Sequence, residues 1–525
     1  MCAQKFLLVH ARHHISTNTS SSASIMPLLP YLLLILLLLS VPFFLSLFGK
    51  KNPPLPGPKK LPIIGNLHQL GAHPHDSLRR LAAAHGPVIF LRLGSVPAVV
   101  VSSAEALREI FTRGHDLALS GRPALHAAGR LSYGGVNVSF APYGEYWRQA
   151  RRVCVLELLS LRRVQSFMHV REQEVALLLQ TIISSASLVP VNLSELLHAL
   201  TNKIMVRVAF GEKFATGDYS RSGGRFGGVF ERTQNNLGAL FVADYFPRLG
   251  WVDALRGLRG RLEKNFQELD EFYEEVIEEH LGGHWPDPEH EDLVHVLLRL
   301  NKDSAPGSAF SSRDHIKGIL TDMFIAGTDT SSATLSWTMT QLMKNPSKMK
   351  KLQQELREII GNKGKVEEAD LHRLTYLKLV IKEVLRLHPP APLLVPRETI
   401  EKCTIKGYEV PLNTRVLINA KAIGLDPNSW ENPNEFRPER FIDNDVDFRG
   451  QDFSLVPFGV GRRSCPGISF ALVVVELALA NLLYCFDWEF PFGVKKEDLD
   501  LEEAVGLTIH RKNPLYLVAK PIYVT

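Results

Sequence analysis

The chain has 525 residues, 45% of them hydrophobic and 22% charged, which is an ordinary composition for a globular protein. Its formal net charge of +5 is mild, and no long basic block or aromatic-basic tract occurs, which argues against nucleic-acid binding. The five cysteines are scattered without a C-x-x-C pair, so neither a disulfide framework nor a zinc site is expected.

Residues 27–48 form an uncharged apolar segment with an unbroken run of Leu and Ile at 32–39. At 1.5 Å per residue, a helix of this length spans roughly 30 Å, the thickness of the hydrocarbon core of a bilayer. The segment is too long for a cleaved signal peptide, and no small-residue cleavage site follows it. We therefore predict one N-terminal transmembrane helix that is retained as an anchor.

Residues 1–25 allow two interpretations. The segment is rich in Ser and Thr, contains no acidic residue and carries Lys5 and Arg12, as organellar transit peptides do. Alternatively, Met26 is the true start, because it opens the apolar run cleanly. We favour the second interpretation, which also removes positive charge from the far side of the membrane.

Residues 49–60 are predicted to be a basic and proline-rich hinge. Its four lysines directly follow the apolar segment, and positive residues stay on the cytoplasmic side, so the domain beyond should face the cytosol. The prolines at 53–58 resist helix formation and give a stiff spacer. Residues 61–525 contain no further linker and no repeat, which predicts one large domain.

Helical patterns dominate this domain. Short strands are expected at 88–93, 98–102, 404–405, 415–420 and 515–519, and surface loops at 217–228 and 284–292. The predicted fold class is mostly α with small β-sheets.

Apolar spacing predicts one long helix over 314–344, stopped by Pro346. Gly327 lies in the middle of its apolar stripe, with Thr330 about 60° and Asp329 about 160° away. Thr330 can therefore face the same cavity as Gly327, while Asp329 has access to water. A central Gly weakens a helix by roughly 1 kcal/mol relative to Ala, so we expect it to make room for a ligand. The alternative role for Thr330 is a bond to its own i−4 carbonyl.

Two shorter helical patterns carry charged pairs. Residues 377–385 form a clean stripe before Pro389, and Glu383 and Arg386 fall away from it, three residues apart. By itself this spacing indicates only an exposed ion pair worth a few tenths of a kcal/mol. Trp147 and Arg151, four residues apart, share one face of a helix.

The most informative segment is 458–467, FGVGRRSCPG, which fits the pattern F-x-x-G-x-R-x-C-x-G at every fixed position. A cysteine placed like Cys465 can give a thiolate to iron, and a thiolate ligand favours O–O cleavage. The glycines let the backbone approach the metal and donate N–H groups to the sulfur. The alternative is an inert buried cysteine in a glycine-rich turn.

Together with AGTDTS at 326–331, this motif resembles the cytochrome P-450 superfamily of haem-thiolate monooxygenases. The phrases LPIIGNLH at 61–68 and YGEYWR at 143–148 are similar to its plant A-type microsomal group. The resemblance covers the chain from residue 61 to its end. It implies the cytochrome P-450 fold, and a haem b held by Cys465.

The resemblance also implies residue roles. Thr330 would line the oxygen-binding groove and Asp329 would supply protons, because a hydroxyl backed by an acid can relay protons through water. Glu383, Arg386 and Arg440 would form a structural network near the haem. The remaining residues expected to hold the cofactor are Trp147, Arg151, Gly327, Arg397, Phe458, Gly461, Arg463 and Gly467.

The substrate pocket is expected at segments that line it in the family. Its predicted members are Met323, Ala326, Leu393, Leu394, Val395, Val505 and Leu507. The last five carry no charge, so we expect a small hydrophobic substrate of plant specialised metabolism, with a terpenoid as one candidate. Such an apolar set is also what a protein core would contain.

No flavin or dinucleotide fingerprint is present, so electrons must come from a partner, and the resemblance implies NADPH-cytochrome P-450 reductase at the endoplasmic reticulum membrane. A basic docking patch for it would comprise Arg148, Arg152, Lys348, Lys350, Lys351 and Arg462. A reductase-independent haem-thiolate isomerase or dehydratase is the main alternative, and a membrane-tethered binding protein with a structural haem is another. The intact pair of Asp329 and Thr330 favours an O2-dependent monooxygenase over both.

Overall fold

The computed structural model describes residues 55–185, 189–215, 228–283, 285–287, 289–303 and 310–522. The expected leader, the membrane helix and most of the hinge lie outside these residues, as does nearly all of the loop expected at 217–228. Within the described part, residues from Leu55 onward form one compact unit. The backbone N–H of Phe90 donates to the carbonyl of Pro56 (2.8 Å), so the folded domain extends further toward the N-terminus than residue 61.

Helices make up most of the domain. They are α2 (Pro74–His85), α3 (Ala104–Thr112), α4 (His126–Leu131), α5 (Glu145–Val153), α6 (Leu161–Ser166), α7 (Met168–Ser185), α8 (Leu193–Phe210), α9 (Glu212–Ala215), α10 (Val229–Leu237), α11 (Trp251–Leu255), α12 (Leu258–Gly282), α13 (Leu293–Lys302), α14 (Arg313–Lys344), α15 (Pro346–Ile360), α16 (Thr375–Leu387), α17 (Ala420–Gly424) and α18 (Ile468–Cys485).

The strands form three small sheets. They are β1 (Val88–Leu93), β2 (Val96–Val101), β3 (Val191–Asn192), β4 (Arg397–Glu398), β5 (Cys403–Ile405), β6 (Tyr408–Val410), β7 (Arg415–Ile418), β8 (Phe486–Glu489) and β9 (Tyr516–Pro521). The largest sheet has the order β1-β2-β7-β4, with β2 and β7 parallel and the other pairs antiparallel. The others are β3-β9-β8 and β5-β6. The mostly α class with small sheets is confirmed.

The expected strands are found with small shifts at their ends. Strand β1 has the predicted bounds, whereas β7 ends at Ile418, two residues early, because the Asn419 side chain accepts the N–H of Ala422 and starts α17. The helix over the expected site, α14, begins one residue before the prediction, after its cap Ser312 accepts the N–H of Asp314 (3.1 Å).

Helix α14 is buried on nearly all sides although it is rich in Thr and Ser. Five of its six threonine hydroxyls, all except that of Thr328, donate to the carbonyl four residues earlier, as Thr334 does to Thr330 and Thr338 to Thr334 (2.8 and 2.7 Å). Because these hydroxyls are paired within the helix, apolar neighbours can pack against it at little cost.

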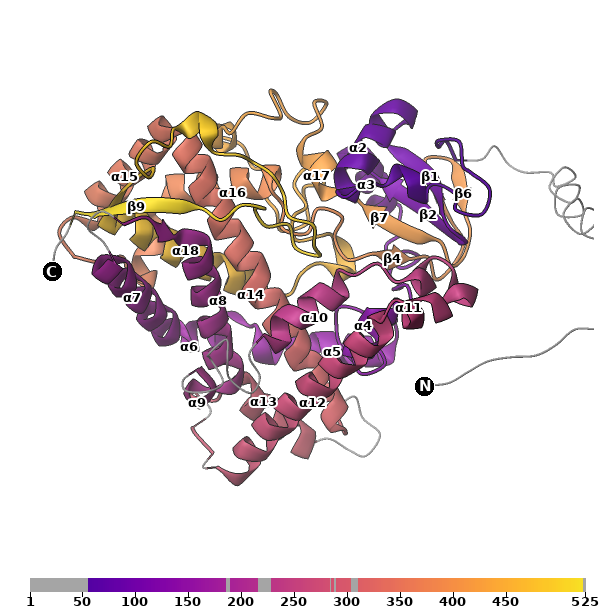
Figure 1. The fold of residues 1–525 in the computed structure, drawn as a ribbon, viewed down its shortest axis with the longest axis horizontal. Helices are drawn as coiled ribbons and strands as arrows, with labels where there is room; N and C mark the ends of the chain where they lie inside the picture. Colours follow the sequence, from indigo (N-terminus) through magenta and orange to yellow (C-terminus); the bar gives the residue numbers. More distant parts are fainter. Residues whose placement is uncertain are drawn as a thin grey trace, which may run out of the picture. The chain divides into compact units, whose positions relative to one another are not determined.

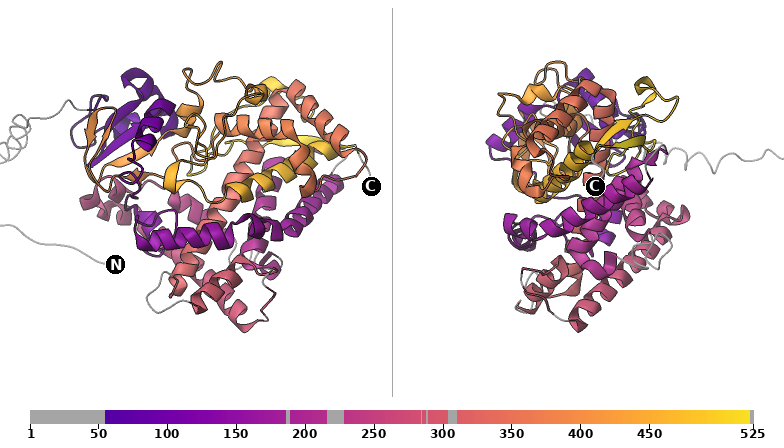
Figure 2. Two further views of the ribbon diagram at one scale, coloured as in Figure 1. Left: turned by 180° about the vertical axis from the view of Figure 1, so that it is seen from behind. Right: turned by 90° about the vertical axis from the view of Figure 1, so that its left-hand side faces the viewer.

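Helix α14 packs against α8, α16 and α18 and forms the centre of the helical part. Figures 1 and 2 show the four-stranded sheet with α2 and α3 at one end of the domain, and α7, α15 and β9 at the other. Among the described helices, only α18 is long and apolar enough to cross a membrane, and 67% of it is buried inside the protein. Its composition is therefore explained by its place in the core.

Candidate active site

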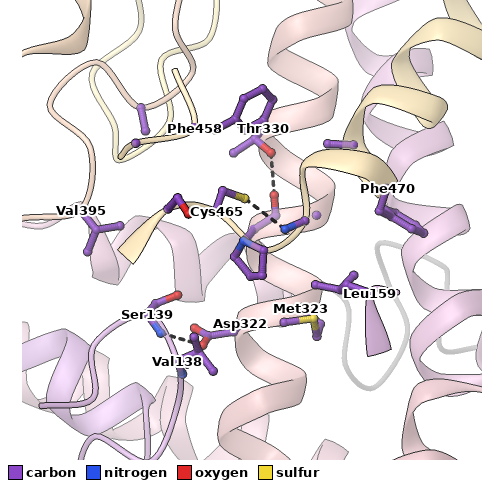
Figure 3. Close-up of a pocket in the computed structure, with 18 of the residues that line it drawn as sticks. Val138, Ser139, Leu159, Asp322, Met323, Thr330, Val395, Phe458, Cys465 and Phe470 are labelled. Atoms are coloured by element: carbon purple, nitrogen blue, oxygen red, sulfur yellow. Dashed lines mark hydrogen bonds between the residues drawn. The ribbon is translucent and has the colours of Figure 1, made fainter. Parts of the chain in front are cut away.

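A cavity of about 270 Å³ lies between α14 and the loop that carries Cys465 (Figure 3). It brings together many of the residues predicted from the sequence, which come from both halves of the chain. The predicted residues that line it are Trp147, Arg151, Met323, Ala326, Gly327, Thr330, Leu394, Val395, Arg397, Phe458, Arg463, Cys465 and Gly467.

Cys465 lies between the short helix η8 (Gly461–Arg463) and the start of α18. Its N–H donates to the carbonyl of Phe458 (2.8 Å), and its Sγ accepts the N–H of Gly467 (3.3 Å). The expected N–H contact to the sulfur is therefore present. Burial raises the pKa of the Cys465 thiol, while the Gly467 N–H and the charge of Arg151 favour the thiolate. A metal ion that binds here would displace the thiol proton.

Gly461 is required for a different reason from the one we expected. Its φ of +64° is in the left-handed region, and an added Cβ would lie 2.5 Å from both Asp116 Oδ1 and Phe111 Cε1. The residue is exposed and does not line the cavity. It therefore closes the Cys loop against the segment around Asp116.

Four arginines converge on the cavity: Arg122, Arg151, Arg397 and Arg463. Burial lowers the pKa of Arg397 to about 10, and burial together with repulsion from Arg397 and Arg151 lowers the pKa of Arg463 to about 9. Their partners are mainly neutral backbone carbonyls, such as that of Val460, which accepts from Arg397 (2.6 Å). Such a concentration of buried positive charge fits the two propionate carboxylates of a haem.

Arg122 belongs to this set although the sequence analysis did not select it. It donates to the carbonyls of Ser139 (2.7 Å), Val395 (2.8 Å) and Pro396 (2.9 Å). The sequence surrounding Arg122 carries no spacing that distinguishes it from a surface arginine. Only the fold places it beside Arg463.

Thr330 lines the cavity, and its hydroxyl donates to the carbonyl of Ala326 (2.7 Å), the i−4 bond that was the alternative interpretation. In this bond the Thr330 hydroxyl is the donor, so its oxygen can still accept a hydrogen bond from a group in the cavity. Asp329 does not line the cavity; it lies on another side of α14, where His510 Nε2 is 2.6 Å from its Oδ1. Burial would raise the pKa of Asp329, but the hydrogen bonds from His510 and Thr508 outweigh it and hold that pKa below its ordinary value.

His510 is a second residue that sequence reasoning missed. It comes from the segment before β9, far along the chain from Asp329, and no local pattern marks it. Its side chain is 32% exposed, whereas that of Asp329 is 12% exposed. The pair therefore connects the flank of α14 to solvent.

Gly327 lines the cavity and also lies close to a second helix. A Cβ on Gly327 would lie 2.7 Å from the Sδ of Met205, a residue of α8. Because α8 and α14 pack closely along their lengths, the glycine allows the approach of the neighbouring helix as well as lining the cavity.

The pair Glu383 and Arg386 is fully buried, not an exposed surface pair. Arg386 binds Glu383 through two parallel hydrogen bonds of 2.8 Å, and Arg440 Nε donates to the same carboxylate (3.0 Å). Arg386 also donates to the carbonyls of Gly424 and Pro433 (2.6 and 2.7 Å), which ties α16 to distant loops. The three residues thus lie together, away from the cavity, in a position suited to a structural role.

Three residues expected in the substrate pocket are not brought to the cavity. Val505 and Leu507 are 71% and 37% exposed, because their loop lies against Gly238 at the end of α10. Leu393 packs against the cluster under the β1–β2 sheet, whereas the adjacent Leu394 lines the cavity. Leu394 has a left-handed φ of +54°, a conformation that costs of order 1 kcal/mol for a non-glycine residue and often occurs at functional sites.

The fold and the cysteine-centred cavity define a haem-thiolate protein. Residues 55–518 match the family model "Cytochrome P-450". The chain is 57% identical to cytochrome P-450 71A9 of Glycine max over 89% of this chain and 93% of that protein. It is 53% identical to strychnine-11-hydroxylase of Strychnos nux-vomica (89% and 91% covered) and 48% identical to 4-hydroxyphenylacetaldehyde oxime monooxygenase of Sorghum bicolor (88% and 88%). A zebrafish cytochrome P-450 structure with progesterone superposes with a TM-score of 0.72 at 25% identity, covering 85% of this chain and 99% of that one.

The chain belongs to the cytochrome P-450 family and, within it, to the plant A-type group. It is an oxidoreductase with a haem b cofactor, and its activity as a monooxygenase requires O2, an organic substrate and a source of electrons. A haem held by Cys465 would supply the iron at which O2 is activated. In this arrangement Cys465 would provide the thiolate, the four arginines would bind the propionates, and Thr330 would present its hydroxyl to the cavity.

Proposed function

We propose that this enzyme inserts one oxygen atom of O2 into a small hydrophobic plant specialised metabolite, with a terpenoid as the first candidate. The observation that carries the proposal is the composition of the cavity above Cys465. Met323, Ala326, Leu394 and Val395 are apolar, and the cavity's arginines are the residues that we expect to bind the haem propionates. Such a surface recognises a substrate mainly by shape and burial of apolar area.

The relatives support the substrate class and not a single compound. The relatives include a protein named strychnine-11-hydroxylase and one named 4-hydroxyphenylacetaldehyde oxime monooxygenase, which are named for two different compounds. We therefore propose for this chain only the general reaction, the hydroxylation of a plant metabolite. The apolar cavity is the reason to test terpenoids first.

For the electron donor we propose NADPH-cytochrome P-450 reductase, docking on the predicted basic patch. Much of that patch is already paired: Arg462 Nε donates to Asp116 (2.8 Å), and Lys348 and Lys351 share Glu439 (2.8 and 3.1 Å). Lys350 is exposed. Reversing the charges of Lys350 and Lys351 should slow haem reduction at low salt, and an unchanged rate would exclude this surface.

We propose that residues 27–48 anchor the enzyme in the endoplasmic reticulum membrane as a single pass, with residues 55–525 in the cytosol. The support is the apolar run and the lysines that follow it. If residues 1–25 act as a leader, an organellar membrane is the alternative. Fluorescent fusions starting at Met1 and at Met26 would separate the two locations.

A reductase-independent isomerase or dehydratase remains the alternative activity. The hydroxyl of Thr330 in the cavity favours the monooxygenase, because an isomerisation requires no delivery of protons to oxygen. Product formation that depends on NADPH and reductase would support the monooxygenase, and turnover without either would support the alternative.

The test of the substrate class is a spectral titration of the full-length enzyme in detergent. Monoterpenoids, aromatic aldoximes and simple phenolics would be added while the ferric haem band is followed. A low-to-high-spin shift with the monoterpenoids alone would support the proposal. A shift with only the polar compounds would exclude the terpenoid class.

A further inference from the structure

Asp322 is the only carboxylate among the described residues that line the cavity. It lies on α14, two helical turns before Thr330, and its side chain is almost fully buried (8% exposed). None of the roles expected above, proton supply or binding of the propionates, was assigned to Asp322. A buried carboxylate is costly unless its oxygens are hydrogen-bonded, so its partners indicate its role.

The partners of Asp322 all come from one loop. Its Oδ1 accepts from Asn137 Nδ2 (2.8 Å), and its Oδ2 accepts the backbone N–H groups of Val138 (2.7 Å) and Ser139 (2.9 Å). Figure 3 shows Asp322 facing Val138 and Ser139 across the edge of the cavity. With three donors already bound, the carboxylate has little capacity left to bind a substrate. Its contacts therefore hold the loop in place and leave little acceptor capacity for a ligand in the cavity.

The opposite edge of the same loop binds residues of the propionate side. The carbonyl of Val138 accepts from Trp147 Nε1 (3.0 Å) and Arg463 Nη1 (3.2 Å), and the carbonyl of Ser139 accepts from Arg122 Nε (2.7 Å). The N–H groups of two consecutive residues thus bind α14, while their carbonyls bind Arg122, Trp147 and Arg463, the residues expected to face the propionates.

A glycine keeps this loop close to α14. A Cβ on Gly318, one turn before Asp322, would lie 2.7 Å from the carbonyl oxygen of Val136. The helix backbone and the loop backbone therefore nearly touch. Any displacement of the loop from Asp322 must move the carbonyls of Val138 and Ser139 relative to the arginines.

We propose that Asp322 is a positioning residue that holds residues 137–139 against α14 and thereby sets Arg122, Trp147 and Arg463 for the haem propionates. Its ionised, acceptor-only form is the one that matches three donors. Burial, partly offset by the hydrogen bonds from the loop, raises the pKa of Asp322 to about 6, so the ionised form prevails at cytosolic pH. The proposal concerns retention of the haem and does not depend on the identity of the substrate.

The test compares Asp322→Asn with the wild type in the full-length, haem-loaded enzyme. An asparagine keeps the size but offers one acceptor oxygen and places an NH2 group against N–H donors, so the loop must shift. The matched control is Asp314→Asn, the same change at an exposed position in the first turn of α14. The readouts are the rate of haem transfer to excess apomyoglobin and the propionate bands of the resonance Raman spectrum.

We expect Asp322→Asn to lose haem about tenfold faster than the wild type, with shifted propionate bands, because buried donors lose their acceptor. The control should match the wild type in both readouts. Unchanged transfer and unchanged bands in Asp322→Asn would overturn the proposal. So would a lower melting temperature with unchanged bands, since that pattern indicates only general packing.

A milder variant keeps the proposal testable if Asp322→Asn does not accumulate as folded protein. Asn137→Ala removes one of the three donors to Asp322 and leaves the two backbone N–H groups in place. It should shift the same bands and speed haem transfer by a smaller factor. Wild-type behaviour of this variant in both readouts would overturn the proposal.

Discussion

The hydroxyl of Thr330 can be separated from its structural bond by comparing two threonines on the same helix. Thr330→Ala removes the bond to Ala326 (2.7 Å), and Thr338→Ala removes an equal bond to Thr334 (2.7 Å). Thr338 is fully buried and does not line the cavity. Both changes also replace Thr by Ala, which has the higher helix propensity by about 0.6 kcal/mol.

The two variants should therefore have similar stability. The carbonyl that loses the threonine hydroxyl keeps its own hydrogen bond in the helical backbone. We therefore expect the free energy of unfolding of each variant to change by no more than about 1 kcal/mol. The small cavity left at the buried Thr338 adds a further loss of stability to that variant. A general acid or base contributes about 10²–10⁴-fold to a proton-transfer step, so only Thr330→Ala should divert electrons from product to peroxide.

The assay measures NADPH consumed, product formed and peroxide released, using whichever compound gives the spin-state shift. We expect a several-fold fall in product per NADPH for Thr330→Ala and no change for Thr338→Ala. Equal loss of coupling in both variants would show that helix packing, and not the cavity hydroxyl, is responsible. If Thr330→Ala forms as much product per NADPH as the wild type, the hydroxyl of Thr330 does not take part in proton supply.

Three further predictions follow from the same geometry. Cys465→Ser should still fold around α14 and α18, but its haem should show no thiolate signature in the ferrous carbon monoxide spectrum; an unaltered spectrum would exclude Cys465 as the ligand. Glu383→Gln should lower stability by about 3–5 kcal/mol, because Arg386 and Arg440 would then be buried without their carboxylate, and thermal unfolding would measure this loss against the exposed Glu497→Gln as control. The pKa of Asp329 is lowered in the folded state, so its pair with His510 stabilises the enzyme above about pH 4 and loses this effect as the pH falls through the folded pKa. In Asp329→Asn, the free energy of unfolding should therefore fall less steeply as the pH is lowered below about 4. The same pH dependence in the variant and the wild type would contradict the lowered pKa.

Some features of the site depend on local sequence alone. The Cys465 segment places an N–H two residues after the thiol, and this spacing sets the hydrogen bond from Gly467 to the sulfur. The long helix and its ends follow from apolar spacing and from Pro346, and the observed bounds differ from the expected ones by a single residue at the start. These features were predictable because 3.6-residue periodicity and turn chemistry act between near neighbours in the chain.

Other features depend on contacts between distant segments. Glu383 and Arg386 have the spacing of an exposed pair, and only the loops near Gly424 and Pro433 bury them. Val505 and Leu507 are as apolar as Leu394, but the path of their loop leaves them at the surface.

The sequence by itself therefore determined the class of this protein, the cysteine motif expected to ligate iron and the helix expected to face it, because each is encoded within a few residues of chain. Only the tertiary structure decided which charges are compensated. Arg122 finds its partners 17, 273 and 274 residues away along the chain, Asp322 finds its partners 183–185 residues away, and His510 finds its partner 181 residues away. Burial of these groups requires partners, and no pattern local to any of them specifies which partners the fold supplies.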